Sequence, residues 1–511
     1  MKRSIRRWHE AEKRRIGRRL AAAEGGREPR TGGGPEFAAR RVRYEVAKRV
    51  HATPYSGIAA IQSLAWKVGL VQQLNQGLKV LKRHRPYAES DHILNIAYNV
   101  LCGGRVLDDL ELRRNDVAFL DALGARTIPD PTTAGDFCRR FEAESINKMM
   151  DLVNEVRLGV WRQQRQDFFD KTACIDADGS IVATSGECKQ GMGLSYDGQW
   201  GYHPLLISLA NTGEPLFVLN RSGGRPSAEG AAPLLDKAIA LCRRAGWKNI
   251  LLRGDTDFSQ TAHLDRWHEA GVNFVFGFDA RRPMIDRAQG LDEDEYRVLV
   301  RKADAAFAER EQRSKQPRVK EQVVRERSYR NMRLQREDVA EFEHKPKAAC
   351  RAYRMVVLRK TIVEERGQRC LGQTYRYFFY LTNVRDVPAE QVVRESNQRC
   401  NQENLIEQLK NGVRALYAPL NTLEANWAYM VIASLAWSLK AWFALLLPVR
   451  ERWADKHHAD KHCVLRMDFR SFVQRFILIP AQIVRTGRRI VCRLLAWRPD
   501  LPTLFRWLDS G

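Results

Sequence analysis

Apolar residues recur at helical spacing over the first long patterned stretch of the chain. In "GIAAIQSLAWKVGLVQQL" (57–74) an apolar side chain returns every three or four residues, which is the period of a helix with one buried face. The segment "IPDPTTAGDFCRRF" (128–141) reads as a turn that feeds another helix, with Thr132 or Thr133 as its cap. Residues 51–165 are therefore predicted to be helical.

The pattern changes after residue 171, where short apolar runs replace the helical period. These runs read as strands, and "NTGE" (211–214), which separates the runs at 202–210 and 215–220, is a typical hairpin turn. Helices and strands then alternate, which is the order of an α/β domain with a mixed sheet. The predicted strands are "TACIDADGSIVAT" (172–184), "YHPLLISLA" (202–210), "PLFVLN" (215–220), "KNILLRGD" (248–255) and "NFVFGF" (273–278), and the predicted helices are "APLLDKAIALCRRAG" (232–246) and "TAHLDRWHEAG" (261–271).

Residues 280–350 are rich in charge and poor in apolar anchors, and strands return at "YRMVVLRKTIV" (353–363) and "YRYFFYLTN" (375–383). Two predicted helices of opposite character follow. "QRCNQENLIEQLK" (398–410) is polar at nearly every position, whereas "NTLEANWAYMVIASLAWSLKAWFALLL" (421–447) is almost wholly apolar. The predicted organisation is a basic flexible arm (1–50), a helical region (51–165), the first part of an α/β core (166–279), a β-rich insertion (280–390), the C-terminal helices of the core (391–448) and a basic C-terminal helical region (449–511).

The charge balance favours a polyanionic partner. The chain carries 85 Lys and Arg against 61 Asp and Glu, a net charge of +24, and a field of this sign is typical of nucleic-acid binding. A generally basic, Arg-rich proteome is the other explanation. A short helix that ends in exposed Arg139 and Arg140 suits a DNA groove, and a plain helical bundle fits the same pattern.

Neither the cysteines nor the hydropathy indicates export or a membrane partner. The ten cysteines include no CxxC pair, as is typical of reduced cytosolic thiols. "HHADKHC" (457–463) reads as a metal site or as a solvated linker. The start "MKRSIRRWHEAEKRR" has no apolar leader segment. Trp427–Leu447 is long enough to span a bilayer but contains Lys440, so a buried core helix and a cytoplasmic protein are expected.

Three pairs of acidic residues lie at strand ends and on the polar helix. Carboxylates placed in this way can hold two Mg²⁺ ions about 3.5–4 Å apart, the arrangement used in phosphoryl transfer. Oxygen donors favour Mg²⁺ or Mn²⁺ over zinc. Asp after a strand is also common in turns and helix caps, so each pair alone fits a structural role. The pairs are Asp176 and Asp178, Asp255 and Asp257, and Glu403 and Glu407.

One enzyme class fits two of these pairs. "IDADGS" (175–180) resembles the DxDGT motif of haloacid-dehalogenase-like phosphatases, and "ILLRGDTDF" (250–258) resembles their late Gly-Asp motif. The resemblance implies Asp176 as nucleophile and Asp178 as acid/base. That fold needs a loop and a helix after the first motif, where a hairpin is predicted here, and it explains neither the charge nor the polar helix.

The polar helix carries a second resemblance. "SNQRCNQENLIEQLK" (396–410) resembles the Y-x2-R-x3-E-x6-K signature of DDE transposases from bacterial insertion sequences. Arg399, Glu403 and Lys410 match the pattern, and Ser396 stands in the tyrosine position. At about 100° per residue these three side chains fall within about 40° of one another on a helix. One face of the polar helix would then point at metal and phosphate, and the apolar helix behind it would seat it in the core.

Further strings resemble the thirteen-eighty group of these transposases, which is related to the insertion-sequence four-like enzymes. This resemblance implies Asp178 and Asp255 as the two catalytic aspartates, 77 residues apart, and Glu403 as the glutamate, 148 residues further on. His203 either approaches the site from the hairpin or is structural. The strings are "GYHPLLISLANTGEPL" (201–216), "NRSGGRP" (220–226), "YFFYLTN" (377–383) and "MDFRSFVQRFILIPAQIV" (467–484).

The resemblance implies an α/β protein with an RNase H-like catalytic domain, a β-rich insertion and an N-terminal helical DNA-binding region. It implies a cut-and-paste transposase that binds terminal inverted repeats and target double-stranded DNA, as a homodimer. Two Mg²⁺ ions, for which Mn²⁺ can substitute, would be held by Asp178, Asp255 and Glu403, while Arg399 and Lys410 would grip transposon-end phosphates. A catalytically inactive or domesticated DNA-binding relic and the phosphatase remain the alternatives.

Overall fold

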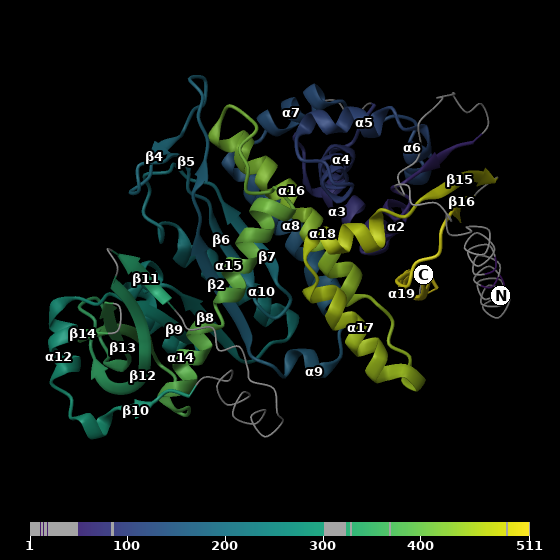
Figure 1. Ribbon diagram of the computed structural model, residues 1–511. Coiled ribbons are helices and arrows are strands. Elements are labelled where there is room, and N and C mark those ends of the chain that lie inside the picture. Colours follow the sequence, from purple (N-terminus) through teal and green to yellow (C-terminus); the bar gives the residue numbers. More distant parts are fainter. Residues whose placement is uncertain are drawn as a thin grey trace, which may run out of the picture. The chain divides into compact units, whose positions relative to one another are not determined.

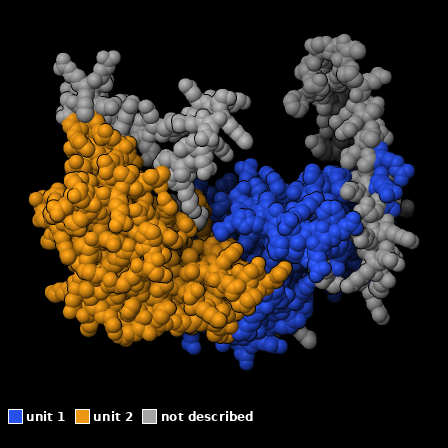
Figure 2. Space-filling view, turned by 90° about the horizontal axis from the view of Figure 1, so that it is seen from below, with its two compact units in different colours: residues 1–164, 188–190, 407–511 blue, residues 165–187, 191–406 orange. Residues whose placement is uncertain are grey.

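The computed structural model describes residues 50–82, 86–300, 323–327, 330–366, 369–486 and 489–509, with isolated residues 11, 14 and 18 before them (Figure 1). The basic arm predicted for residues 1–50 lies almost entirely outside these ranges. The chain divides into two compact units, which Figure 2 colours separately. Unit 1 comprises residues 1–164, 188–190 and 407–511, and unit 2 comprises residues 165–187 and 191–406.

Unit 2 is built on one large mixed sheet. β6 runs antiparallel to both β2 and β7, whereas β8 is parallel to β2 and β9 is parallel to β8. Each strand is buried over most of its length, and so the predicted apolar runs are confirmed as strands. The strands, in the spatial order β7-β6-β2-β8-β9, are β2 (Ala173–Gly179), β6 (Leu205–Leu209), β7 (Glu214–Leu219), β8 (Ile250–Gly254) and β9 (Asn273–Phe278).

Helices connect and cover these strands. Parallel neighbours need a crossover connection, and α10 (Ala231–Ala245) and α11 (Leu264–Glu269) supply two of them, as predicted. α10 packs against β2, β6, β7 and β8. The tight β6–β7 turn contains Gly213 at φ +68°, a conformation that glycine adopts without strain. The remaining short elements of this part are α9 (Gln166–Phe169), β3 (Val182–Ala183), β4 (Gly193–Leu194) and β5 (Trp200–Tyr202), of which the last three form a small sheet in the order β3-β5-β4.

The predicted β-rich insertion does contain long strands, but they join the core sheet. β14 (Arg369–Thr382) pairs antiparallel with β9, and β13 (Tyr353–Arg366) and β12 (Arg330–His344) continue outward from it. β10 (Arg297–Val298) and β11 (Val323–Arg327) both pair with β12. The insertion also holds α12 (Arg282–Gln289), and α14 (Ala389–Asn397), which follows it, buries Val392 and Val393 against these strands.

Unit 1 is helical and surrounds α16 (Leu423–Leu445). Every residue of α16 from Ala425 to Leu445 is buried, because α2, α4, α7, α8 and α17 all pack against it. Within the described residues α16 is the one helix long and apolar enough to cross a membrane, and it lies entirely inside the unit. The other helices are α2 (Ile58–Lys67), α3 (Leu70–Gly77), α4 (Glu89–Leu101), α5 (Leu110–Arg114), α6 (Val117–Leu123), α7 (Pro131–Arg139), α8 (Ala143–Trp161), α17 (Ala454–Arg466), α18 (Phe469–Phe472) and α19 (Leu501–Leu508).

Two local details of unit 1 differ from expectation. The cap of α7 is Asp130 rather than Thr132 or Thr133, since an Asp130 carboxylate oxygen accepts a 2.8 Å hydrogen bond from the backbone N–H of Thr133. The C-terminal region, expected to be helical, also contains the hairpin of β15 (Ala481–Thr486) and β16 (Arg489–Leu494). β15 pairs with β1 (Ala52–Thr53), so this small sheet joins the two ends of unit 1.

The polar helix is not continuous, and the prediction of one straight polar face is wrong. α14 ends at Asn397, α15 spans Cys400–Glu407, and a π-helical turn follows over Gln408–Gly412. Arg399 therefore lies in the break before α15, and Lys410 lies in a turn whose wider period rotates it away from the α-helical position. Lys410 also belongs to unit 1, whereas Arg399 and Glu403 belong to unit 2.

Candidate active site

Asp178 and Asp255 lie at the ends of neighbouring strands. Asp178 is near the end of β2, and Asp255 directly follows β8. The two strands are parallel, with Asp176 opposite Arg253, so the register brings the two aspartates to the same edge of the sheet. Both line one cavity of about 560 Å³ within unit 2. The carboxyl ends of parallel strands are where α/β folds commonly build their sites.

Arg399 connects these two aspartates. One guanidinium nitrogen, Nη1, lies 3.4 Å from Oδ2 of Asp178 and 3.7 Å from Oδ2 of Asp255. The Asp178 and Arg399 side chains are mostly buried, and that of Asp255 is about one-third exposed. A single cation therefore sits against two carboxylates that come from different strands.

The cavity makes Asp178 and Asp255 weaker acids than usual. Burial raises the pKa of Asp178 to about 6; Arg399 opposes the shift, and the charges of Asp255 and Glu403 add to it. Burial is also the main cause that raises the pKa of Asp255, again opposed by Arg399, with Asp257 as the added negative neighbour. Carboxylates whose charge is disfavoured by burial and by one another gain most from a bound cation.

Glu403 lies on α15, outside the lining of the cavity. Its side chain is exposed, and its charge is among those that raise the pKa of Asp178. The adjacent Gln402 is buried and holds α15 to the sheet, because it accepts a hydrogen bond from Ser208 and donates one of 3.4 Å to the carbonyl of Leu206. Gln402 can thus be buried although it is polar, because Ser208 and Leu206 of β6 supply its hydrogen-bond partners.

The donor chemistry around Asp178 and Asp255 fits a hard divalent cation. Both groups offer carboxylate oxygens, the donors that Mg²⁺ and Mn²⁺ prefer, and they already share a cationic partner. Within the described ranges, no three His, Cys, Asp or Glu side chains lie close enough to hold one ion. A three-carboxylate site would therefore require Glu403 to approach the two aspartates.

His203 borders the same cavity. It is buried, and its Nδ1 donates a 3.2 Å hydrogen bond to the carbonyl of Arg225. A Cβ on Gly179 would lie 2.6 Å from Nε2 of His203. The glycine that follows Asp178 thus leaves room for the imidazole.

Asp176 does not serve the role that the phosphatase alternative gives it. It is completely buried, and its two carboxylate oxygens accept hydrogen bonds of 2.7 and 2.9 Å from Nε and Nη2 of Arg253. Arg253 also donates to the carbonyl of Glu395 at 3.2 Å. A nucleophile must reach its substrate, and a bidentate buried carboxylate cannot. The pair instead joins β2, β8 and α14 beneath Asp178 and Asp255.

The remaining residues singled out in the sequence lie in three different places. Asp257 lines the cavity, and its backbone N–H donates to Asp255 at 3.0 Å. Arg139 and Arg140 lie at the end of α7 in unit 1, both exposed. "HHADKHC" (457–463) is neither linker nor metal cluster, since it lies within α17 and His457 Nδ1 accepts a hydrogen bond from the backbone N–H of Arg450.

Sequence reasoning missed Arg253 and Tyr196. Arg253 was detectable as the one charged residue in the buried run "ILLRG", because a buried charge demands a partner. Tyr196 lines the cavity and is 95% exposed, the highest exposure among the large apolar side chains of the described residues. Its position in a loop between β4 and β5 left no periodic signal.

Comparison with known proteins places the chain in a family. No curated protein matches the sequence. Among solved structures it is similar to a piggyBac transposase in a synaptic complex with hairpin DNA, at 10% identity and a TM-score of 0.36, with 84% of this chain and 88% of that chain covered. The family described as Transposase DDE domain group 1 matches residues 50–509, nearly the whole chain. The protein therefore belongs to this family of DDE transposases.

Proposed function

We propose that this transposase excises its element by a cut-and-paste reaction, in which Asp178, Asp255 and Glu403 hold two divalent metal ions. The observation that carries the proposal is the convergence of Asp178 and Asp255 from parallel strands onto one cavity and one shared cation. Glu403 is the third ligand in this proposal because it lies on α15, four residues after Arg399, which contacts both aspartates.

The strand order supports an RNase H-like catalytic domain. The five core strands run β7-β6-β2-β8-β9, with β6 antiparallel to its neighbours and β2, β8 and β9 parallel. In this order the first and fourth strands of the core lie side by side, which is what brings Asp178 next to Asp255. The long strands after β9 would form the β-rich insertion of the thirteen-eighty group.

The metal ions would be Mg²⁺, or Mn²⁺ instead of Mg²⁺. When bound here they would activate the attacking oxygen and stabilise the leaving oxygen of a phosphodiester. The side chains of the protein have distinct tasks. Asp178 and Asp255 fix the cation positions, and the burial of Asp178 excludes water from one side. Arg399 supplies positive charge that a DNA phosphate can share once the carboxylates have another cation.

The DNA partner would be the terminal inverted repeats of the element and then the target duplex, engaged by a homodimer. Lys410, Arg139 and Arg140 are proposed to contact the DNA backbone. Because backbone contacts release counterions, affinity should fall steeply as salt rises. The net charge of +24 supports such a partner.

The test is cleavage of a labelled duplex that carries the inverted repeat flanking the gene, in Mg²⁺ and then in Mn²⁺. Asp178→Asn, Asp255→Asn and Glu403→Gln should abolish cleavage and retain DNA binding. The matched controls are Asp257→Asn and Glu407→Gln, which remove the same groups two and four residues away. Binding without cleavage by the wild-type protein in either metal would favour the DNA-binding relic instead.

A further inference from the structure

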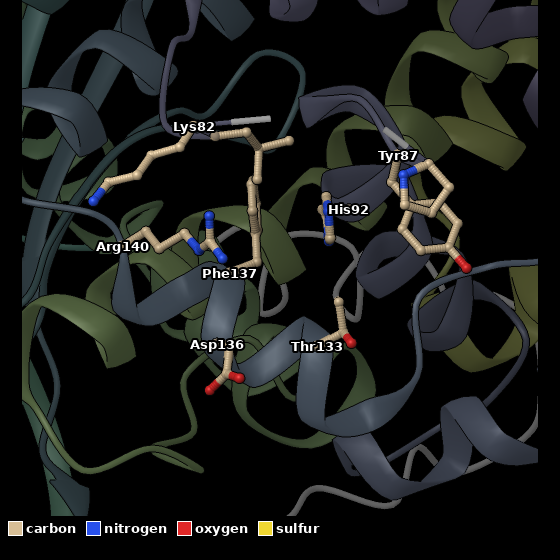
Figure 3. Close-up of a pocket in the computed structure, with 9 residues that line it drawn as sticks. Lys82, Tyr87, His92, Thr133, Asp136, Phe137 and Arg140 are labelled. Atoms are coloured by element: carbon tan, nitrogen blue, oxygen red, sulfur yellow. The ribbon is translucent and has the colours of Figure 1, made fainter. Parts of the chain in front are cut away.

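A second cavity lies in unit 1, in the helical region that carries Arg140. Its volume is about 450 Å³, within the range of roughly 300–1,000 Å³ that is typical of small-molecule sites. It shares no residue with the cavity of Asp178 and Asp255. Its lining, shown in Figure 3, is Leu81, Lys82, Pro86, Tyr87, His92, Thr133, Asp136, Phe137 and Arg140.

His92 is the most unusual group in this wall. It is 5% exposed, its ring stacks on Phe137 at 4.4 Å between centroids, and Tyr87 meets it edge-on at 5.6 Å. Its Nδ1 is buried and has no hydrogen-bond partner among the described residues. Burial and the nearby charge of Arg140 lower the pKa of His92 to about 4, so the ring is neutral. A buried polar atom without a partner is costly, and a bound polar group would remove that cost.

Two cations border the same cavity. Lys82 and Arg140 are exposed, and neither forms an ion pair with a described residue. The one carboxylate in the lining, Asp136, is already paired with Arg139 at 2.7 Å. Figure 3 shows Lys82 and Arg140 extending on one side of Phe137, with His92 and Tyr87 on the other. An anion would therefore meet two cations without ion pairs beside an aromatic wall. The unsatisfied Nδ1 of His92 in this wall is closed to solvent, so a ligand would reach it only after a neighbouring side chain moves.

We propose that this pocket binds a nucleotide, with its phosphate at Lys82 and Arg140 and a polar edge of its base bonded to Nδ1 of His92. The apolar side chains of Leu81, Pro86 and Tyr87 supply the surface against which a planar base packs, as aromatic and apolar groups do in single-strand binding. The nucleotide belongs either to a DNA strand, unpaired at that position, or to the free pool. The pocket is independent of the catalytic carboxylates.

The experiment measures binding by the full chain to two kinds of probe. One is each free deoxynucleoside monophosphate, by calorimetry; the other is a duplex with one bulged nucleotide against a fully paired duplex of equal length. Arg140→Gln should weaken binding roughly tenfold or more, because it removes a charged hydrogen bond to the phosphate. Arg105→Gln is the matched control, since it removes the same charge from an exposed residue of unit 1 that does not line the pocket.

His92→Phe separates a ligand-binding role from a structural one. It keeps the ring stack on Phe137 and removes the unpartnered Nδ1, so we expect a higher melting temperature together with weaker nucleotide binding. A structural histidine would show a lower melting temperature and unchanged binding. Asp178→Asn should leave the pocket's affinity unchanged, so failure of the catalytic proposal and failure of this one are distinguishable.

Each outcome decides the proposal. Binding of monophosphates that Arg140→Gln weakens and Arg105→Gln does not would support a free-nucleotide source. Preference for the bulged duplex with the same pattern of variants would support a nucleotide within DNA. No binding of either probe, or equal weakening of binding to every DNA probe by Arg105→Gln and Arg140→Gln, would overturn the proposal and indicate a generally basic surface.

Discussion

Replacing Arg253 with Met should destabilise unit 2 strongly. Arg253 and Asp176 are 2% and 1% exposed at their side chains and share two hydrogen bonds of 2.7 and 2.9 Å. Removing one partner of such a pair leaves the other charge buried and uncompensated, which costs ~3–5 kcal/mol. Burial already raises the pKa of Asp176, so protonation of Asp176 would bring the cost toward the lower end of this range.

The loss of stability within unit 2 can be measured by amide hydrogen exchange. Amides of β2 and β8, which the pair joins, should lose roughly a hundredfold to several thousandfold of their protection, since ~1.4 kcal/mol corresponds to a factor of ten. The control is the double variant Asp176→Leu with Arg253→Met. Replacing both charges with apolar groups is often neutral or stabilising, so most of the protection should return.

Loss of the Asp176–Arg253 pair should also have a functional consequence. Because Asp176 and Arg253 lie two residues before Asp178 and Asp255 on the same strands, loss of the pair should loosen the alignment of the two aspartates. A change of less than ~1 kcal/mol in Arg253→Met, or a double variant no more stable than the single one, would refute the view that the buried pair fixes these strands.

Three further predictions concern local chemistry. Burial lowers the pKa of Lys440 to about 7, so between about pH 7 and 10 the unfolded chain binds more protons than the folded chain, and the free energy of unfolding should rise with pH. In urea denaturation, Lys440→Met should show a smaller rise of this free energy with pH. An equal rise in the variant and the wild type would contradict the lowered pKa of Lys440. Gly179→Ala would place a Cβ 2.6 Å from Nε2 of His203 and should lower the melting temperature, whereas adding His203→Ala should restore it if this clash is the cause. Asp130→Ala removes the cap of α7 and should cost ~1 kcal/mol, read from the urea midpoint; an unchanged midpoint would mean that the packing of α7 alone holds its first turn.

The parts of the fold that local patterns specify could be predicted from sequence. The apolar runs of β2, β6, β7, β8 and β9 are each long enough and bounded clearly enough to be read as strands. Asp178 lies one residue before the end of β2 and Asp255 directly follows β8, and their spacing to Glu403 resembles that of a known family. The catalytic candidates therefore needed no knowledge of tertiary contacts.

What could not be predicted depends on contacts between distant segments. A helical pattern in the sequence is read by assuming the same rotation of about 100° at every residue. Such a pattern cannot predict the break at Gln398–Arg399 or the π turn after Glu407. Arg399, which contacts both aspartates, lies in that break. The hairpin β15–β16 is stabilised by pairing with β1, more than 400 residues earlier in the chain, and its own alternation is too short to identify it.

The pairing of β14 with β9 determines what happens if the insertion is removed. Thr382 Oγ1 donates to the carbonyl of Phe274 at 2.7 Å, and the backbone N–H of Phe274 donates to the side-chain oxygen of Asn383 at 2.9 Å. Excising the insertion would leave β9, with its buried aromatic residues, as an unprotected outer strand, which is a template for self-association. The inserted strands are thus not a removable module: a shortened descendant of this chain would have to evolve a new cover for β9 before it could stay soluble.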